Sequence, residues 1–349
     1  IIRSKARAWI FLLLVGIATL ASLSLFYTRD VTVKLLPFDN KSELQVVADL
    51  PEGSSVEDTA RVLAQAADAA LTMPEVTSVQ TYAGEPAPFN FNGLVRHYYI
   101  RTSPELGDVQ VTLSPKSDRS RSSHDIALEL RQKLTALQLP EGTAIKVVEP
   151  PPGPPVLATL LAEIYGPDPE TRRATAAKVR EAFNAVPFVV DVDDSYGQQT
   201  PRMRVSIDQD NLEYQKVEED DVYDTLQSLY ADNTVGYSHR GGGRQPIPIT
   251  VGLPKQGKVM NERALSTPVP ANALPGARGI VELGDVVSVR TELTSFPIFR
   301  HNGKPTEMVT GELAGAFEAP VYGMIEVGHA LDTLNWNGLQ KPQILLHGQ

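Results

Sequence analysis

The residues best suited to bind a ligand lie in one loop, residues 82–93, with the sequence YAGEPAPFNFNG. Two phenylalanines, Phe89 and Phe91, stand there on a backbone interrupted by glycine and proline. Apolar rings on such a backbone suit an adaptable pocket for apolar molecules, and we expect both rings to contact such ligands. The same rings could equally anchor the loop to the protein core, so both roles stay open at this point.

No catalytic arrangement is recognisable elsewhere in the sequence. The six histidines, among them His97, His124, His239 and His301, lack metal-ligand spacing, and neither a GxSxG motif nor a P-loop occurs. We therefore expect no enzyme activity, no catalytic residue, no cofactor and no metal site. The acidic run DVDD that begins at Asp191 could bind a cation weakly, and five scattered methionines lack the close spacing of a soft-metal relay.

A second candidate site is the segment RGGGR, in which Arg240 and Arg244 flank three glycines. Phosphate capture would need a strand-to-helix context, which this segment lacks. The pattern instead predicts the tip of a β-hairpin. We hypothesise that Arg240 and Arg244 dock a protein partner rather than a substrate.

The composition limits the classes of protein to consider. The chain has 349 residues, enough to bury two or more cores. Its formal net charge of −10 argues against nucleic acid as a partner, since nucleic-acid binding needs a basic surface. The absence of cysteine removes disulfides, thiolate metal sites and cysteine nucleophiles together.

An uncharged apolar run, residues 9–27, follows Arg3, Lys5 and Arg7 near the N-terminus. Its length of roughly 19 residues is close to the ~20 that a helix needs to cross a bilayer. Because positive flanks stay cytoplasmic, the rest of the chain should lie outside the cytoplasm. The alternative is a cleaved signal peptide, but its apolar core is shorter, about 7–15 residues, and no convincing cleavage site follows here.

Two segments, residues 54–84 and 168–197, repeat one pattern of helix, proline and strand. The first helix should begin at a capping box of Ser54 and Glu57, with an apolar stripe at positions 56, 60, 63, 67 and 71, and the second at Pro169. Chance similarity of two generic units is the alternative, but the shared spacing PxVxxV favours duplication.

Each copy continues into further elements. Strands are predicted at 98–100 and 109–113 in the first copy and at 203–207 in the second. A helix over 123–137 and a strand over 144–148 complete a β-α-β-β-α-β, ferredoxin-like plan in the first copy.

The closing elements of the second copy come much later in the sequence. They are a hairpin over 299–311, centred on Asn302 and Gly303, and a helix over 319–334. A segment with its own acidic helix, 218–230, and the hairpin at Arg240 is inserted before them.

The expected fold class is α+β. Four regions are expected, listed in order along the chain: a transmembrane helix in 1–30, a first ferredoxin-like subdomain in 31–155, a second in 156–210 and 298–349, and an inserted α+β subdomain in 211–297.

The order of short motifs along the chain resembles a known family. The motifs are LPFDN at 36–40, LPEGSSVEDT at 50–59, MPEVTSV at 73–79, LGDV at 283–286 and RHNGKP at 300–305. Over nearly the whole chain this order is similar to the second half of an inner-membrane permease of the resistance-nodulation-division (RND) efflux family, acriflavine-resistance type.

The resemblance implies a proton-driven antiporter of the bacterial inner membrane, with most of this chain in the periplasm. Its partners would be two further copies in a homotrimer, a periplasmic adaptor (membrane fusion) protein, an outer-membrane channel, membrane lipid and amphipathic small-molecule substrates. The two ferredoxin-like units would be porter subdomains, and the insertion would be a funnel subdomain that docks the channel. A singly anchored periplasmic binding or assembly module without transport activity is the alternative.

The resemblance also implies a substrate path. Residues 84–92 occupy the place of the family's switch loop, although Pro86 and Pro88 depart from its Gly- and Phe-rich composition. Strands that face the inner drug pocket would carry Gln80, Tyr82 and Tyr99. The candidate binding residues are Gln80, Tyr82, Gly84, Pro88, Phe89, Phe91 and Tyr99. The proton-relay residues would lie in membrane helices outside this sequence, so the chain should be one piece of a larger permease.

Overall fold

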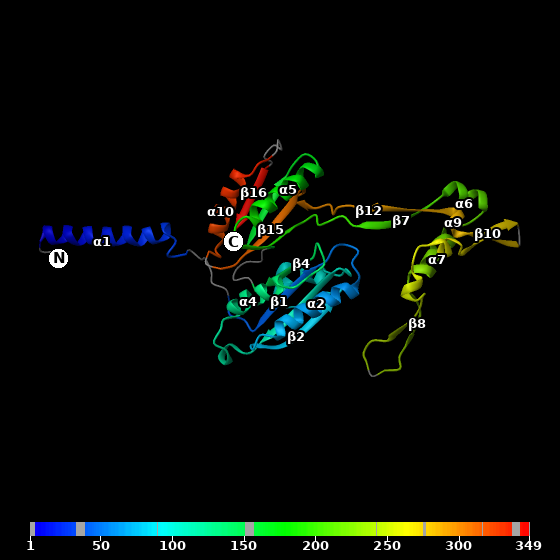
Figure 1. The fold of residues 1–349 in the computed structure, drawn as a ribbon, viewed down its shortest axis with the longest axis horizontal. Coiled ribbons are helices and arrows are strands. Elements are labelled where there is room, and N and C mark those ends of the chain that lie inside the picture. The colour runs from blue at the N-terminus through cyan, green and yellow to red at the C-terminus, as the bar shows by residue number, and fades with distance from the viewer. Residues whose placement is uncertain are drawn as a thin grey trace. The chain divides into compact units, whose positions relative to one another are not determined.

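The computed structural model describes residues 4–32, 39–88, 90–150, 157–241, 243–274, 277–315, 317–336 and 343–348. The chain forms two compact units, Ile1–Thr200 with Ser295–Gln349, and Pro201–Thr294. The first unit contains an N-terminal helix and two subdomains, each with one four-stranded sheet (Figure 1).

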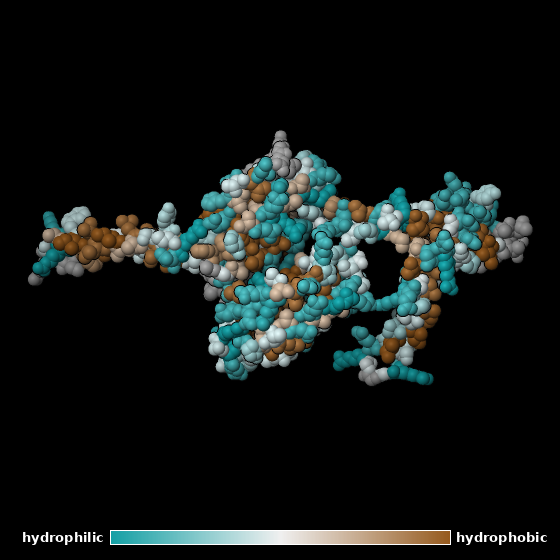
Figure 2. Space-filling model, viewed as in Figure 1, coloured by the Kyte–Doolittle hydropathy of each residue, from teal (hydrophilic) through white to brown (hydrophobic). Residues whose placement is uncertain are grey.

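Helix α1 (Lys5–Tyr27) covers the predicted apolar run and extends it by four residues toward the N-terminus. Among the described residues it is the one helix long and apolar enough to cross a bilayer. None of its residues is buried, and hydrophobic residues follow one another along it (Figure 2). Arg3, part of the predicted positive flank, lies outside the described residues.

The first subdomain has the predicted β-α-β-β-α-β order. Its main elements are β1 (Glu43–Asp49), α2 (Val56–Leu71), β2 (Val76–Ala83), β3 (Leu106–Leu113), α4 (Ser123–Thr135) and β4 (Ala144–Val148). Shorter pieces are α3 (Phe91–Arg96) and the 3-10 helices η1 (Tyr98–Ile100) and η2 (Lys116–Asp118). The strands lie in the order β2-β3-β1-β4, and every neighbouring pair is antiparallel. Helices α2 and α4 cover one face of this sheet (Figure 1), where Val46, Leu63 and Leu130 are buried in one core.

The start of α2 differs from the sequence prediction by one residue. Ser54 turns back and donates its hydroxyl hydrogen to the carbonyl of Pro51 at 2.7 Å, so Ser55 becomes the N-cap and accepts from the amide of Asp58. The buried stripe also differs from the predicted one, because the two ends of that stripe, Val56 and Leu71, are exposed at 38% and 55%. The buried residues are Thr59, Val62, Leu63, Ala66 and Ala70.

The second subdomain repeats the topology of the first. Its elements are β5 (Leu160–Tyr165), α5 (Pro169–Asn184), β6 (Val189–Asp194), β13 (Arg300–His301), β14 (Lys304–Pro305), β15 (Glu307–Leu313), α10 (Pro320–Thr333) and β16 (Gln343–Gly348). The order β16-β5-β15-β6 equals that of the first sheet, fourth-first-third-second, and all pairs are antiparallel. The ferredoxin-like fold class is thereby confirmed for both subdomains.

Two local predictions in the second subdomain are borne out. Asp168 caps α5 with Pro169 in its first turn. Asn302 and Gly303 adopt φ of 49° and 76° between β13 and β14, as a type I′ turn requires.

The strand predicted at 203–207 has a different role from the one expected. It belongs to β7 (Pro201–Ile207), which pairs with β12 (Val287–Leu293) in a two-stranded ribbon, and the third strand of the second sheet is β15. The inserted unit therefore begins near residue 201, whereas the sequence indicated 211.

The inserted unit has its own small core. Its remaining elements are α6 (Gln209–Gln215), α7 (Glu219–Tyr230), β8 (Asn233–Ser238), β9 (Ile247–Val251), η3 (Lys255–Gly257), α8 (Glu262–Leu265), β10 (Pro268–Leu274), β11 (Ala277–Glu282) and α9 (Leu283–Val286). Leu212, Val222, Val269 and Leu283 are buried together. Strands β8 and β9 form the hairpin predicted around Arg240.

Candidate functional site

The loop after β2 is held by hydrogen bonds to the sheet. Gly84 has φ of 74°, a conformation that favours glycine, and a Cβ atom there would lie 3.2 Å from Val56 Cγ2. The backbone amide of Ala87 donates to the Asp108 carboxylate at 2.9 Å. Asn90 caps α3 by accepting from the amide of Gly93 at 2.6 Å. The loop is thus tied to β3 at Ala87, and Asn90 sets the start of α3.

A cavity of about 530 Å³, here named the loop cavity, opens beside this segment. Its lining residues are Gly84, Glu85, Pro86, Ala87, Pro88, Tyr99 and Thr102. Tyr99 is 41% exposed, and its ring packs edge-on against His97, with the ring centroids 5.9 Å apart. Proline, alanine and the tyrosine ring give the cavity an apolar wall, and the hydroxyls of Tyr99 and Thr102 and the carboxylate of Glu85 add polar groups, which suits a small amphipathic molecule.

The structure brings three of the seven predicted binding residues, Gly84, Pro88 and Tyr99, to this cavity. Gln80 and Tyr82 lie on β2, where the Tyr82 hydroxyl donates to the Gln80 side chain at 2.7 Å. Phe91 is the first residue of α3, and its side chain lies outside the described part of the chain. Phe89 lies outside the described residues altogether.

Tyr99 lies in the 3-10 helix η1, so the strand predicted at 98–100 is wrong. The reason is local. His97 adopts the left-handed conformation at φ of 57°, which ends α3 and turns the chain directly into η1.

A larger cavity, about 1070 Å³, separates the two subdomains of the first unit. We call it the cleft. One side carries Asp49 and Lys146, from β1 and β4, and the other carries Asp191 and Asp193, from β6. Both sides of the cleft therefore carry charged side chains among their apolar and uncharged polar residues.

Ion pairs join the subdomains across this boundary. Arg96 lies 2.6 Å from Glu312 on β15, and both side chains are largely buried. The Thr159 hydroxyl also donates to Glu312. Burial would raise the pKa of Glu312, but the positive charge of Arg96 and these hydrogen bonds outweigh it, so the pKa lies below its ordinary value. Glu312 is therefore a buried, ionised carboxylate.

The acidic run DVDD is matched by basic side chains of the protein itself. Asp191 pairs with Arg131 at 2.9 Å, Asp193 pairs with Lys146, and Asp194 pairs with Arg180 at 2.7 Å. Asp191 has φ of 53° beside a shift in the register of β6 and β15. The cation partners of this run are thus arginine and lysine, in place of the weakly bound ion considered from the sequence.

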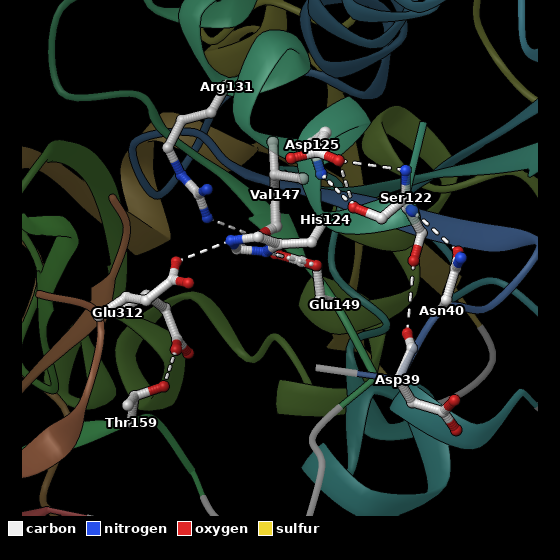
Figure 3. Close-up of polar contacts among 12 residues, drawn as sticks. Asp39, Asn40, Ser122, His124, Asp125, Arg131, Val147, Glu149, Thr159 and Glu312 are labelled. Atoms are coloured by element: carbon white, nitrogen blue, oxygen red, sulfur yellow. Dashed lines mark hydrogen bonds and ion pairs between the residues drawn. The ribbon is translucent and has the colours of Figure 1, made fainter. Parts of the chain in front are cut away.

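His124, at the start of α4, joins two carboxylates from different subdomains. Its Nδ1 lies 3.0 Å from Glu149 (Figure 3), and its Nε2 lies 2.7 Å from Glu318, just before α10. Burial would lower the pKa of His124, but the hydrogen bonds to both carboxylates and their charges outweigh it and raise the pKa to about 9. The imidazole is therefore protonated near neutral pH and clamps the two subdomains together.

Comparison with known proteins identifies the family. The sequence model of the AcrB/AcrD/AcrF family matches residues 2–320. The chain belongs to the AcrB/AcrD/AcrF family. It is thus related to the RND efflux permeases, as the order of its motifs indicated.

Solved structures show the same fold. Two crystal forms of a heavy metal efflux pump superpose with TM-scores of 0.72 and 0.71, at 18% and 19% sequence identity. They cover 99% and 96% of this chain, which spans 34% of each of those chains. The search of curated proteins found no match.

The charged contacts in this AcrB/AcrD/AcrF-family chain were missed by reasoning from sequence. Arg96 and Glu312 are 216 positions apart, and Lys146 and Asp193 are 47 apart. Each residue alone looks like an ordinary surface charge. Only the packing of the two subdomains shows that these side chains are partners.

Arg240 and Arg244 lie at the exposed end of the β8–β9 hairpin. Tyr237 and Ile247 are exposed on its strands, at 61% and 56%. A hairpin with exposed apolar side chains and two arginines at its tip is suited to a protein contact, and the docking role of both arginines stays a prediction.

Proposed function

We propose that this chain is the periplasmic substrate-binding and assembly portion of a proton-driven RND efflux permease. The permease exports drugs or other amphipathic compounds through a tripartite complex with an adaptor protein and an outer-membrane channel. It works as a trimer in the inner membrane. The observation that carries the proposal is the pair of subdomains with identical strand order, facing each other across a cleft. Two similar subdomains with a cavity between them can move relative to each other by hinge or shear motion, as a transport cycle requires.

Amphipathic organic compounds fit the described residues better than heavy metals, the cargo of the efflux pump seen in the two solved structures. Soft metal ions need clustered thiolate or thioether ligands. The chain has no cysteine. Met73 is buried in the first core, Met324 packs against the second, and Met260 lies in the inserted unit. The loop cavity, with its proline and tyrosine walls, is the better candidate for the substrate.

The Tyr99→Ala variant tests the substrate path. If the ring contributes ~1.4 kcal/mol of ligand contact, its removal weakens the apparent affinity about tenfold. We expect efflux of several unrelated dyes by the full-length permease to fall to different extents. The melting temperature of the variant should equal that of the wild type. Tyr223→Ala, an exposed tyrosine on α7, is the matched control. Equal loss for all dyes together with a lower melting temperature would show that the ring is structural.

Reversing the charge of the hairpin tip tests the assembly role. The double variant Arg240→Glu and Arg244→Glu should weaken docking to the outer-membrane channel, since like charges at an interface disfavour the complex. Crosslinking yield in cells that carry the full-length permease measures this. Arg263→Glu, an exposed arginine of the same unit, should leave the yield unchanged. Retained crosslinking with lost dye export would contradict the assignment of the tip to docking.

A further inference from the structure

Each of two walls of the loop cavity is held by one charged side chain. Asp108 on β3 accepts from the amide of Ala87 and so holds the wall formed by residues 84–88. Arg101 lies in the chain between Tyr99 and Thr102, which form the opposite wall. Its guanidinium donates to the carbonyl of Ala48 at 3.2 Å, which fixes this wall to β1.

The two holding residues are themselves an ion pair. Arg101 Nε lies 3.5 Å from Asp108 Oδ1. The Asp108 side chain is 1% exposed, and a buried carboxylate needs hydrogen bonds and a nearby cation to stay ionised. Burial, together with the nearby charge of Asp49, raises the pKa of Asp108 above its ordinary value, although the Ala87 amide and Arg101 act in the opposite direction. A change in the position of Arg101 therefore changes the electrostatic stabilisation of Asp108 and the hydrogen bond that Asp108 accepts from the Ala87 amide.

Arg101 is also connected to the second subdomain. Its Nη2 atom lies 2.5 Å from Asp49 Oδ1, and the other oxygen of Asp49 lies 3.8 Å from Lys146 Nζ. Lys146 in turn pairs with Asp193 across the cleft. Five charges of alternating sign thus lead from the loop to the other subdomain, in the order Asp108, Arg101, Asp49, Lys146 and Asp193.

We propose that Asp108 and Arg101 are positioning residues that couple the loop cavity to the contact between the two subdomains. The proposal rests on the proposed function only in treating this cavity as part of the substrate path. When the subdomains move apart, Lys146 loses its ion pair with Asp193 and pairs more closely with Asp49. Asp49 then attracts Arg101 less strongly, so Arg101 moves toward Asp108. This stabilises the Asp108 carboxylate and strengthens its hydrogen bond with the Ala87 amide. Contact between Lys146 and Asp193 across the cleft has the opposite effect and weakens the hydrogen bond between the Ala87 amide and Asp108.

Two substitutions should therefore shift the loop in opposite directions. Asp193→Asn imitates the parted state, in which Lys146 pairs with Asp49 and Arg101 moves toward Asp108. Lys146→Met leaves Asp49 with Arg101 as its remaining partner in this series, which draws Arg101 away from Asp108. A merely structural role would loosen the loop in both variants.

Hydrogen exchange of the Ala87 amide, measured on the full 349-residue chain in detergent, reports the bond to Asp108. Pro86 and Pro88 have no amide hydrogen, so fragmentation mass spectrometry resolves Ala87 between them. A hydrogen bond to a charged group stabilises the closed state enough that weakening it should be measurable. We expect Lys146→Met and Asp108→Asn each to speed exchange of the Ala87 amide about tenfold. Asp193→Asn should slow it. The Gly84 amide, bonded to the Leu106 carbonyl at 2.8 Å, should stay unchanged as the internal control.

Lys133→Met, a partly exposed lysine of α4 that pairs with Glu129, is the matched control and should leave the Ala87 exchange rate at the wild-type value. The coupling is wrong if Lys146→Met and Asp193→Asn shift the rate in the same direction, or if either leaves it unchanged. Exchange is measured without transport. Lack of dye export by the full-length permease would therefore count against the proposed function alone, and an unchanged exchange rate would count against the coupling alone.

Discussion

Replacing Glu312 by alanine is expected to lower the free energy of unfolding by about 3–5 kcal/mol, because it leaves Arg96 as a buried charge without its carboxylate. The Arg96 side chain is 8% exposed, so water cannot replace the lost partner without opening the boundary between the subdomains. Urea unfolding of the full chain in detergent, followed by circular dichroism, measures the change.

Two further variants show whether the loss comes from the buried charge. Glu181→Ala removes an exposed carboxylate on α5 that pairs with Lys178, and it should cost at most about 1 kcal/mol. The double variant Arg96→Met with Glu312→Leu removes both charges and should recover most of the stability lost in Glu312→Ala. An effect of Glu312→Ala no larger than that of Glu181→Ala would show that the pair is solvated and does not hold the subdomains together.

The second large effect is a fall in stability as the pH rises, caused by His124. Its pKa is about 9 in the folded chain, above the ordinary value of 6.5. A raised pKa means that the folded state binds the proton more tightly, so the stabilisation is fully present below about pH 6.5 and is lost as the pH rises through about 9. The contribution lost over this range is about 3 kcal/mol.

The measurement is the urea midpoint between about pH 6 and pH 9.5, compared for the wild type and His124→Gln. The variant should be less stable at the acidic end and should approach the wild type at the alkaline end. His329→Gln, an exposed histidine of α10, is the control and should follow the wild type throughout. If His124→Gln has the same pH profile as the wild type, the clamp between Glu149 and Glu318 does not contribute to stability.

Several features of this protein were predictable because they depend on short stretches of sequence. The apolar run of α1, the cap of α5 at Asp168, and the turn at Asn302 and Gly303 each follow from the conformational preference of a few neighbouring residues. Strand β4 also has the predicted bounds, Ala144–Val148. The order of the short motifs from residue 36 to residue 305 was enough to indicate the efflux-permease family.

The pairing of distant segments was not predictable in this way. Strands β7 and β15 are both seven-residue segments that mix apolar and charged residues, and which of them completes the second sheet depends on which one packs against β5 and β6. A strand has no local signal for its partner, because its stability depends on the neighbouring strands against which it packs. The inserted unit of more than 90 residues separates β15 from β5 and β6 in the sequence, so the sequence gives no indication that they pair.

In the candidate site, too, local features were predictable and contacts between distant residues were not. The composition of residues 84–93 was enough to predict a loop with glycine, proline and aromatic residues, and the acidic residues from Asp191 onward are evident in the sequence. That Asp108 and Arg101 hold this loop, and that Arg131 and Lys146 neutralise the acids, follows from the packing of the folded chain. The physical reason is that an ion pair needs its two charges within a few ångströms, and residues far apart in sequence meet at that distance only after the subdomains have packed.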